Sequence, residues 1–339
     1  MLVVDDSAFA RKVLREVLSR VPELELVGFA RDGLEALERI AELKPDVVCL
    51  DLVMPELDGV GLLRELKNLP DRPHVVVVSF SDHDSEAVIE ALALGAFDVV
   101  KKPTALATDR MYELAAPLTK VVLEAVAARP VRAPAPVAES AALALDARLA
   151  TTRSLLAIGT STGGPQALAT LMPRLPANFP LPVVIALHIP GEYTGALAAR
   201  LASASKLAVV EATDGIELVP GVAVLARGGQ HLVIERQGER LGARVTRAPR
   251  DTLYHPSVNV LFGSAAKACG RGVIGVVLTG MGDDGLEGSR AVVEAGGVVL
   301  NEAESSCVVY GMPRAVKEAG LSQGSAPLER MAEVILRQL

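Results

Sequence analysis

Three glycine-rich turns in the C-terminal part of the chain carry residue types that could together perform nucleophilic catalysis. Ser161 lies in the turn GTSTGG, directly after an apolar run and directly before a helical pattern. His188 follows a second apolar run, and Asp283 and Asp284 lie in a third turn, TGMGDDG, after another apolar run. A nucleophilic serine needs a base, and the base needs an acid that orients it. The sequence therefore predicts a serine hydrolase with Ser161 as nucleophile, His188 as base and one of the two aspartates as acid.

The serine motif by itself is weak, because glycine-rich strand-to-helix turns also cradle phosphate. Its glycines let the backbone turn sharply, and N–H groups such as that of Met281 in the third turn could stabilise an oxyanion. The order Ser, His, Asp differs from the order in α/β-hydrolases, which indicates a separate α/β scaffold. Of the other histidines in this part, we expect His231 to be structural or solvated, and His255 either lines the cleft or packs.

A second set of polar residues follows the strands predicted in the N-terminal part. Asp5 and Asp6 come after the first strand, Asp51 ends the third, Ser79 ends the fourth, and a Lys-Lys-Pro run follows the fifth. The carboxyl ends of parallel strands meet at one edge of a sheet, where clustered carboxylates are costly unless a cation neutralises them. Carboxylate oxygens suit Mg²⁺. The pattern predicts a phosphoryl-transfer site, and the alternative is that Asp6 and Asp51 cap helices and turns.

Alternating apolar runs and helix-period patterns predict the elements that position these residues. The N-terminal part reads as five β-α units, which is typical of a doubly wound parallel sheet. The Ala- and Pro-rich stretch 128–152 is predicted to be a linker, with helical turns at 139–149. The domains are therefore expected at 1–127 and 153–339. The predicted strands are 2–4, 24–30, 46–50, 74–79 and 97–100, then 154–158, 182–187, 207–211, 222–226, 231–235, 273–278 and 297–300.

The second domain is predicted to be α/β with a mostly parallel sheet and some antiparallel decoration. The runs 222–226 and 231–235 are joined through RGGQ, which favours a β-hairpin. Helices are predicted at 7–20, 32–43, 59–67, 84–94 and 109–127 in the first domain, and at 165–173, 192–204, 257–268, 284–295 and 312–319 in the second.

The composition narrows the class of protein. Hydrophobic residues make up 50% of the 339 and aromatic residues only 3%, which favours buried parallel sheets built from Ala, Val, Leu and Ile. The net charge is -7 and no basic run occurs, which argues against nucleic-acid binding. No apolar run reaches the roughly 18 residues that a membrane span needs, and no signal peptide is expected. Three cysteines at unrelated spacings fit a reducing cytoplasm and no metal template.

The segments VVDDS, DLVMPELDG, VSFSD and VVKKP resemble the receiver domain of two-component response regulators over roughly residues 1–125. The resemblance implies a flavodoxin-like sheet, bound Mg²⁺, and phosphorylation of Asp51 by a histidine kinase. It leaves open a start upstream of Met1, because receivers usually have several more residues before the acidic pair. The implied site residues are Asp5, Asp6 and Asp51 for Mg²⁺, with Ser79 as the switch hydroxyl and Lys102 as the lysine.

The segments IGTSTGGPQAL, LHIPGEYTGALAARL, HPSVNVLF and VIGVVLTGMGDDGLEG resemble the catalytic domain of the chemotaxis methylesterase family, CheB, over roughly residues 153–338. The resemblance implies hydrolysis of glutamate γ-methyl esters on methyl-accepting chemoreceptors, and deamidation of certain glutamines. Asp283 stands where a familiar member has Asn, and Asn259 where many have Asp. The implied site residues are Ser161 as nucleophile, His188 as base, Asp284 as acid, and Thr162 and Met281 at the active site, with the Met281 backbone in the oxyanion hole.

Taken together, the two resemblances predict a hydrolase controlled by phosphorylation, in which the receiver lies over the cleft until Asp51 is phosphorylated. We expect a cytoplasmic monomer whose partners are chemoreceptors and a histidine kinase, with no cofactor for hydrolysis itself. One rival is a non-hydrolytic module that binds a phosphorylated ligand through its glycine turns. Another is an esterase or amidase that acts on a different signalling protein.

Overall fold

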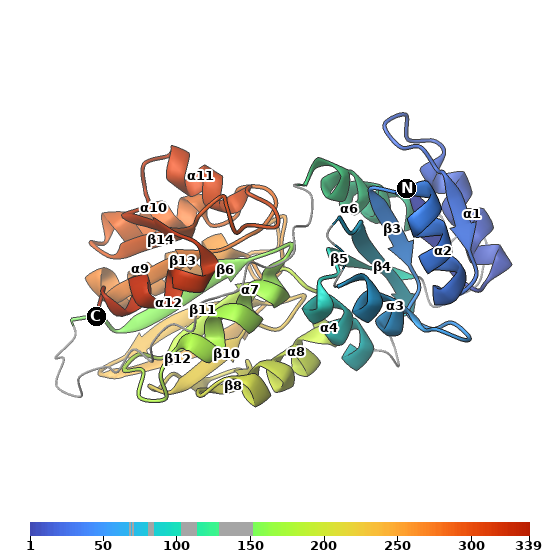
Figure 1. Cartoon of the computed structure of the whole chain (residues 1–339). Helices are drawn as coiled ribbons and strands as arrows, with labels where there is room; N and C mark the ends of the chain where they lie inside the picture. Colours follow the sequence, from blue (N-terminus) through green and yellow to red (C-terminus); the bar gives the residue numbers. More distant parts are fainter. Residues whose placement is uncertain (68, 70, 81–84, 103–113, 129–151) are drawn as a thin grey trace. The chain divides into compact units, whose positions relative to one another are not determined.

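The chain folds into two compact units, Met1–Pro136 and Val137–Leu339, each of which is described by itself. The predicted linker at 128–152 and its helical turns at 139–149 lie almost wholly outside the described residues, so the predicted domain boundaries stay a prediction. A computed structural model describes residues 1–67, 69, 71–80, 85–102, 114–128 and 152–339 (Figure 1).

The N-terminal unit is built on five parallel strands in the order β2-β1-β3-β4-β5. This is the strand order of flavodoxin-like sheets, as expected. Helices α1 and α6 pack on each other, whereas α3 packs on α2 and α4. The elements are β1 (Leu2–Val4), α1 (Ala8–Leu18), β2 (Gly28–Ala30), α2 (Gly33–Leu43), β3 (Val47–Leu50), α3 (Gly59–Leu66), β4 (His74–Phe80), α4 (Ser85–Leu94), β5 (Asp98–Lys102) and α6 (Ala115–Ala127).

Local sequence explains where these helices begin. Each of the first three starts with a capping side chain that accepts a hydrogen bond from a backbone N–H of the first turn: Ser7 from Ala10 in α1, Asp32 from Glu35 in α2, and Asp58 from Gly61 in α3. Asp6 is therefore not the cap of α1. Strands β1 and β3 are buried along their whole length, as expected where helices cover both faces of a parallel sheet.

The C-terminal unit centres on a seven-stranded parallel sheet in the order β15-β14-β13-β6-β7-β10-β8, beside a smaller antiparallel sheet in the order β11-β12-β9. Strands β9, β12 and β15 and helix α12 were not among the predicted elements. The elements are β6 (Leu155–Thr160), α7 (Gly164–Leu171), β7 (Val183–Leu187), α8 (Gly191–Ala204), β8 (Ala208–Glu211), β9 (Ile216–Glu217), β10 (Val222–Leu225), β11 (His231–Gln237), β12 (Arg240–Thr246), α9 (Val258–Cys269), β13 (Val273–Val277), α10 (Leu286–Glu294), β14 (Val298–Glu302), α11 (Met312–Glu318), β15 (Gly324–Ala326) and α12 (Leu328–Leu336).

The predicted hairpin between 222–226 and 231–235 is wrong. Strand β10 pairs in parallel with β7 and β8, whereas β11 pairs antiparallel with β12 across a two-residue turn that begins at Gly238. Gly228, in the RGGQ segment, is not part of a hairpin turn. A Cβ there would lie 2.4 Å from the backbone nitrogen of Gly191, so glycine is needed because two backbone segments pass close together.

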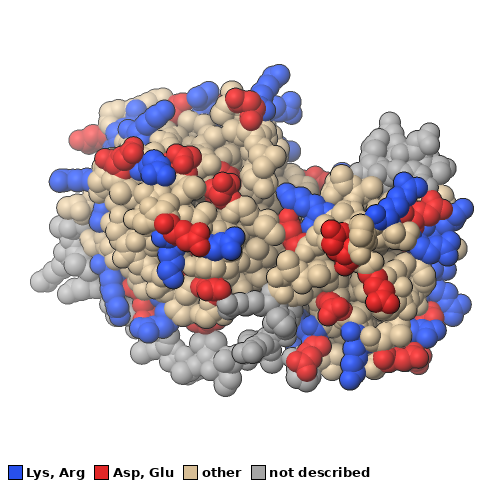
Figure 2. Space-filling model, turned by 90° about the horizontal axis from the view of Figure 1, so that it is seen from above, with Lys and Arg blue, Asp and Glu red and all other residues tan. Residues whose placement is uncertain are grey.

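Charged side chains and helix lengths can be described for the residues that the structure covers. On the face seen in Figure 2, Lys and Arg side chains are interspersed with Asp and Glu. No helix within the described ranges is long and apolar enough to cross a bilayer.

Candidate functional site

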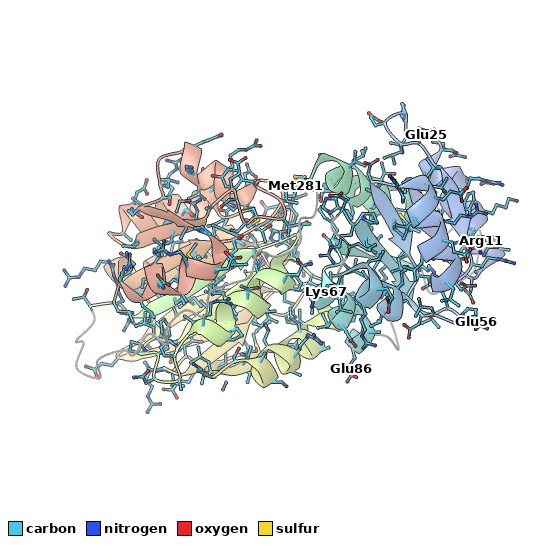
Figure 3. All side chains as sticks on the ribbon, viewed as in Figure 1. Arg11, Glu25, Glu56, Lys67, Glu86 and Met281 are labelled. Carbon is cyan, nitrogen blue, oxygen red and sulfur yellow. The ribbon has the colours of Figure 1, made fainter. Side chains whose placement is uncertain are left out.

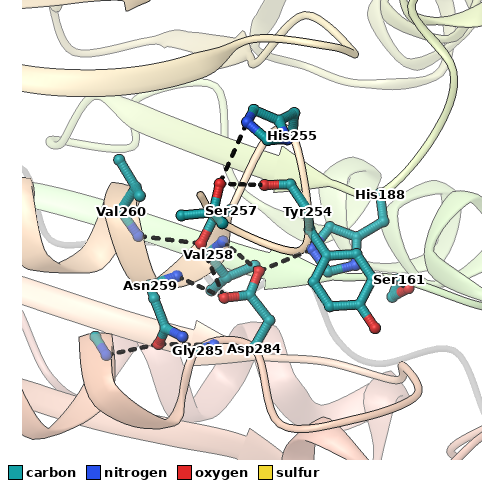
Figure 4. A network of polar contacts seen from close by, with 12 residues as sticks. Ser161, His188, Tyr254, His255, Ser257, Val258, Asn259, Val260, Asp284 and Gly285 are labelled. Carbon is teal, nitrogen blue, oxygen red and sulfur yellow. Dashed lines mark hydrogen bonds and ion pairs between the residues drawn. The ribbon is translucent and has the colours of Figure 1, made fainter. Parts of the chain in front are cut away.

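Three neighbouring strands of the larger sheet bring Ser161, His188 and Asp284 to one edge. Strand β6 pairs with β13 on one side and β7 on the other, all in parallel, so their carboxyl ends meet. Ser161 follows β6 directly and His188 follows β7 directly, while Asp284 lies in the turn after β13. The three side chains that the sequence singled out are therefore brought together by strand order (Figure 4).

The three side chains form a continuous polar chain. His188 Nδ1 lies 3.1 Å from Ser161 Oγ, and His188 Nε2 lies 2.9 Å from Asp284 Oδ2. The side chains of His188 and Asp284 are 9% and 5% exposed, so water screens this contact little. With a proton on Nε2 donated to the carboxylate, the Nδ1 lone pair faces the serine hydroxyl. The geometry is that of a nucleophile, a general base and an orienting acid.

Asp284 is held by the beginning of helix α9 as well as by the histidine. Its carboxylate accepts hydrogen bonds from the Ser257 hydroxyl at 2.9 Å, the Val258 N–H at 2.7 Å and the Asn259 N–H at 3.0 Å. Burial opposes ionisation, but the hydrogen bonds from His188, Asn259 and Val258 outweigh it and lower the pKa of Asp284. The acid is thus a carboxylate at neutral pH.

The structure distinguishes between the two adjacent aspartates. Asp283 is exposed, and its backbone carbonyl accepts a hydrogen bond from the Leu286 N–H. Its side chain does not cap α10, whose N-cap is Gly285. Asn259, noted above as a departure from the family pattern, accepts hydrogen bonds at its Oδ1 from the Gly285 and Gly288 N–H groups and so fixes the turn that carries Asp284.

Tyr254 is a site residue that the sequence did not reveal. Its ring stacks on the His188 ring with centroids 4.1 Å apart and an interplanar angle of 7°. This contact fixes the plane of the imidazole, which must keep both nitrogens in line with their partners. Tyr254 directly precedes His255 in the sequence, but the sequence does not indicate where the ring of a loop tyrosine packs.

The other histidines lie behind this site. His231 is buried, and its Nδ1 accepts a hydrogen bond from the Ser257 N–H, which favours the structural one of the two roles expected for it. His255 packs against it with ring centroids 4.5 Å apart. His255 therefore packs against a structural histidine, one of the two roles left open for it.

The turn that carries Ser161 depends on close backbone contacts. Gly163, the residue before α7, has φ +78°, a conformation that favours glycine. The Ser161 N–H donates to the Thr279 carbonyl at 3.0 Å, so it is not available to an oxyanion. Met281 lies in the loop after β13 (Figure 3). Its N–H donates to no acceptor within the described ranges. Thr162 is buried, and its carbonyl accepts a hydrogen bond from the Thr279 hydroxyl.

In the N-terminal unit, strand ends gather a second polar cluster. Lys102 Nζ lies 2.7 Å from Asp5 Oδ2 and 2.6 Å from Asp51 Oδ2, and all three side chains are almost fully buried. Asp6 is exposed beside them, and Ser79 is buried in β4, the strand between those of Asp51 and Lys102. The five predicted residues therefore lie at the carboxyl ends of adjacent strands.

The acidic cluster fits a divalent cation. Carboxylate oxygens of Asp5, Asp6 and Asp51 lie within 4.8 Å of one another. Burial, reinforced by the charge of Asp5, raises the pKa of Asp51 in spite of the ammonium of Lys102. The charge of Lys102 thus does not fully neutralise the negative charge of the acidic cluster. A divalent cation bound by the carboxylate oxygens would neutralise the remainder.

The fold and the two clusters define a class of protein: a receiver joined to an α/β unit with a hydrolase-type Ser-His-Asp arrangement. Comparison with known proteins agrees. The model of the CheB methylesterase family matches residues 156–335, and the model of the response regulator receiver domain matches residues 1–113. The chain therefore belongs to the CheB methylesterase family and carries a receiver domain.

Individual relatives are similar over their whole length. The protein-glutamate methylesterase/protein-glutamine glutaminase 5 of Myxococcus xanthus is 57% identical, over 100% of this chain and 97% of that protein. The protein-glutamate methylesterase/protein-glutamine glutaminase 2 of Nitratidesulfovibrio vulgaris is 38% identical, over 100% of this chain and 99% of that protein. The crystal structure of the Thermotoga maritima CheB methylesterase catalytic domain is 37% identical with a TM-score of 0.54, covering 55% of this chain and 99% of that one.

Replacement of Asp284, the proposed acid, should lower the stability of the C-terminal unit. Asp284→Asn places an amide N–H₂ among hydrogen-bond donors, so we expect a loss of about 1–3 kcal/mol in unfolding free energy at neutral pH. Because the pKa of Asp284 is lowered on folding, this cost should shrink as the pH falls below the unfolded value near 3.8. Thermal unfolding against pH measures it. Asp283→Asn is the matched control, and an equal loss in that variant would contradict the assignment.

Replacement of the buried acid in the receiver should have the opposite effect. Because the pKa of Asp51 is raised on folding, its charge at neutral pH costs stability, and Asp51→Asn should stabilise the N-terminal unit by about 1 kcal/mol. The difference should shrink as the pH falls towards 3.8, where the native side chain takes up a proton. Unfolding followed in the presence of a chelator tests this, and a destabilised variant at pH 7 would refute it.

Proposed function

We propose that this methylesterase uses Ser161, His188 and Asp284 to hydrolyse glutamate γ-methyl esters, and glutamine side-chain amides, on methyl-accepting chemoreceptors. The observation that carries the proposal is the unbroken chain from Ser161 Oγ through His188 to the Asp284 carboxylate. The names of the full-length relatives supply the substrate class, since they are protein-glutamate methylesterases and protein-glutamine glutaminases.

The steps follow from the two nitrogens of His188. As Ser161 Oγ attacks the ester carbonyl, His188 Nδ1 takes its proton, and the carboxylate of Asp284 stabilises the imidazolium through Nε2–H. The tetrahedral oxyanion collapses, methanol leaves with the proton from Nδ1, and a glutamyl ester of Ser161 remains. Water then attacks with Nδ1 as base again, which releases the glutamate. For a glutamine, ammonia leaves in place of methanol.

The oxyanion needs donors other than the nucleophile's own N–H, which is bound to Thr279. The Met281 N–H is our candidate donor, because this N–H has no acceptor in the described part of the chain and Met281 lies next to Gly280. We place Thr162 at the same site. A Cβ on Gly280 would lie 2.8 Å from Ser161 Cβ, so the two turns are in contact. One preorganised donor typically contributes about 2.7–4 kcal/mol to such a step.

We propose further that a histidine kinase phosphorylates Asp51 and so raises the activity of Ser161. A divalent cation, here assigned as Mg²⁺ held by Asp5, Asp6 and Asp51, would supply charge neutralisation for phosphoryl transfer. Lys102 already contacts Asp51 and would hold one phosphoryl oxygen, and Ser79 would bind another. The proposed site of action is the cytoplasm, in keeping with three cysteines at unrelated spacings, and the proposed acting form is a monomer.

Loss of the nucleophile gives the first test. Ser161→Ala should lower methanol release from methylated receptor membranes by about 1,000-fold or more, because it removes the hydroxyl that contacts His188 Nδ1. The measurement is volatile methanol from membranes labelled on the ester methyl. Ser203→Ala, an exposed serine on α8, should behave as wild type. Near-normal release from Ser161→Ala, or no reaction of the wild type with a serine-directed fluorophosphonate, would exclude the mechanism.

Control by phosphorylation gives the second test. A small phosphodonor with Mg²⁺ should raise methanol release about 5-fold or more, a coupling of ordinary allosteric size, and should leave Asp51→Asn unchanged. Asp46→Asn, an exposed residue at the opposite end of the same strand, is the control and should respond as wild type. Equal activation of Asp51→Asn would show that the phosphodonor acts elsewhere.

A further inference from the structure

A buried network connects the serine turn to a carboxyl group that never reaches the substrate site. Its hub is Thr279, which is 1% exposed and lies two residues beyond the end of β13. The Thr279 carbonyl accepts hydrogen bonds from the Ser161 N–H at 3.0 Å and from the Thr160 hydroxyl at 2.8 Å. Its hydroxyl donates to the Thr162 carbonyl at 3.0 Å. Thr279 therefore contacts the residue on each side of the nucleophile and the nucleophile itself.

The same threonine also fixes the turn that carries the proposed oxyanion donor. Gly280 and Met281 follow it in the chain, and the Thr279 hydroxyl accepts a hydrogen bond from the Val309 N–H. Val309 in turn accepts one from the Gly280 N–H at 3.0 Å. A displacement of Thr279 would thus move the nucleophile and the oxyanion donor relative to each other.

Glu302 holds Thr279 from behind. It ends β14, the strand beside β13, and its Oε2 accepts the Thr279 N–H at 2.8 Å. Its Oε1 accepts the Ser306 hydroxyl at 2.9 Å, and Ser306 Oγ accepts the Leu328 N–H at the start of α12. Glu302 is 0% exposed. A buried carboxyl group is costly, so its presence in this sheet calls for a specific role.

We propose that Glu302 is a positioning residue for hydrolysis at Ser161, acting through the backbone of Thr279. The inference rests on the proposed function. It assigns Glu302 no proton transfer, because its carboxyl group contacts Thr279, Ser306 and Cys307 and none of the reacting atoms. Its contribution is geometric: it sets the distance between nucleophile and oxyanion donor, and a displacement of about 1 Å in such a site can lower the rate by 100-fold.

The ionisation of Glu302 is consistent with a geometric role. Burial, aided by Glu329, raises its pKa to about 7, although hydrogen bonds from Thr279 and Ser306 oppose the shift. A proton on Oε1 would leave Oε2 free to keep the Thr279 bond, while the Ser306 hydroxyl turns to the Ala303 carbonyl 3.3 Å away. Both forms therefore hold Thr279. Glutamine can do the same, with its carbonyl oxygen towards Thr279 and its N–H₂ towards Ser306.

The test uses the full chain and measures both fluorophosphonate labelling of Ser161 and methyl ester hydrolysis. Glu302→Ala should lower the labelling rate and kcat by about 10- to 100-fold while KM changes less than about 2-fold. Glu302→Gln should stay within about 3-fold of wild type. Asn301→Ala is the matched control, because Asn301 is equally buried on the same strand. Its side chain bonds the Glu302 backbone carbonyl, Ser322 and Ser325, and leaves the bond between the Glu302 carboxyl group and Thr279 in place. This control variant should lose stability and keep its labelling rate.

Each outcome bears on the inference. Equal labelling of Glu302→Ala and wild type would overturn it, as would an equal rate loss in Asn301→Ala, which would indicate general loosening of the sheet. If Glu302→Gln lowers the labelling rate as much as Glu302→Ala does, the inference is overturned, because the charge of Glu302 would then be what matters. If Glu302→Ala does not fold, Ser306→Ala decides, with a slower rate expected and an unchanged rate overturning the inference. A wild-type chain that resists labelling contradicts the proposed function itself.

Discussion

The parallel pairing of β13, β6 and β7 is the constraint on which the candidate active site depends. Ser161, His188 and Asp284 are separated by up to 123 positions in the numbering of the chain, and only the register of these strands brings them within hydrogen-bond distance. The receiver obeys the same rule on a smaller sheet, where parallel strands deliver Asp5, Asp51 and Lys102 to one edge. Both units place polar groups where strands end and helices begin, because free N–H groups and main-chain turns occur there.

Much of this arrangement could be predicted from the sequence because it follows from local signals. Apolar runs mark buried parallel strands, and the polar residue after each run must lie at the carboxyl edge of the sheet. That reasoning is enough to bring Ser161 and His188 to one edge. It could not choose between Asp283 and Asp284, because the choice depends on which carboxylate faces the start of α9, a helix that begins 26 residues earlier at Val258.

The site features that sequence reasoning missed depend on packing between distant segments. Tyr254 stacks on His188, and Thr279 and Glu302 support the serine turn, through contacts that no periodicity encodes. The mistaken hairpin has the same origin. The glycine at Gly228 suggested a tight turn, but it is required by the backbone at Gly191. A glycine marks a backbone constraint, and the sequence does not say whether the constraint is a turn or a neighbour.

The double use of the Asp284 carboxylate has a consequence for how this family can change over evolutionary time. The carboxylate contacts His188 and also holds the first N–H groups of α9, so under the proposed mechanism a mutation there would damage folding as well as chemistry. The hydroxyl of Ser161 contacts only His188 among the described residues. A lineage that gave up hydrolysis while keeping the domain as a binding partner would therefore lose its serine at least cost and retain the aspartate. If the proposed mechanism holds, an aspartate retained at this position in a distant homologue is a mark of the fold, and only the serine is a mark of the enzyme.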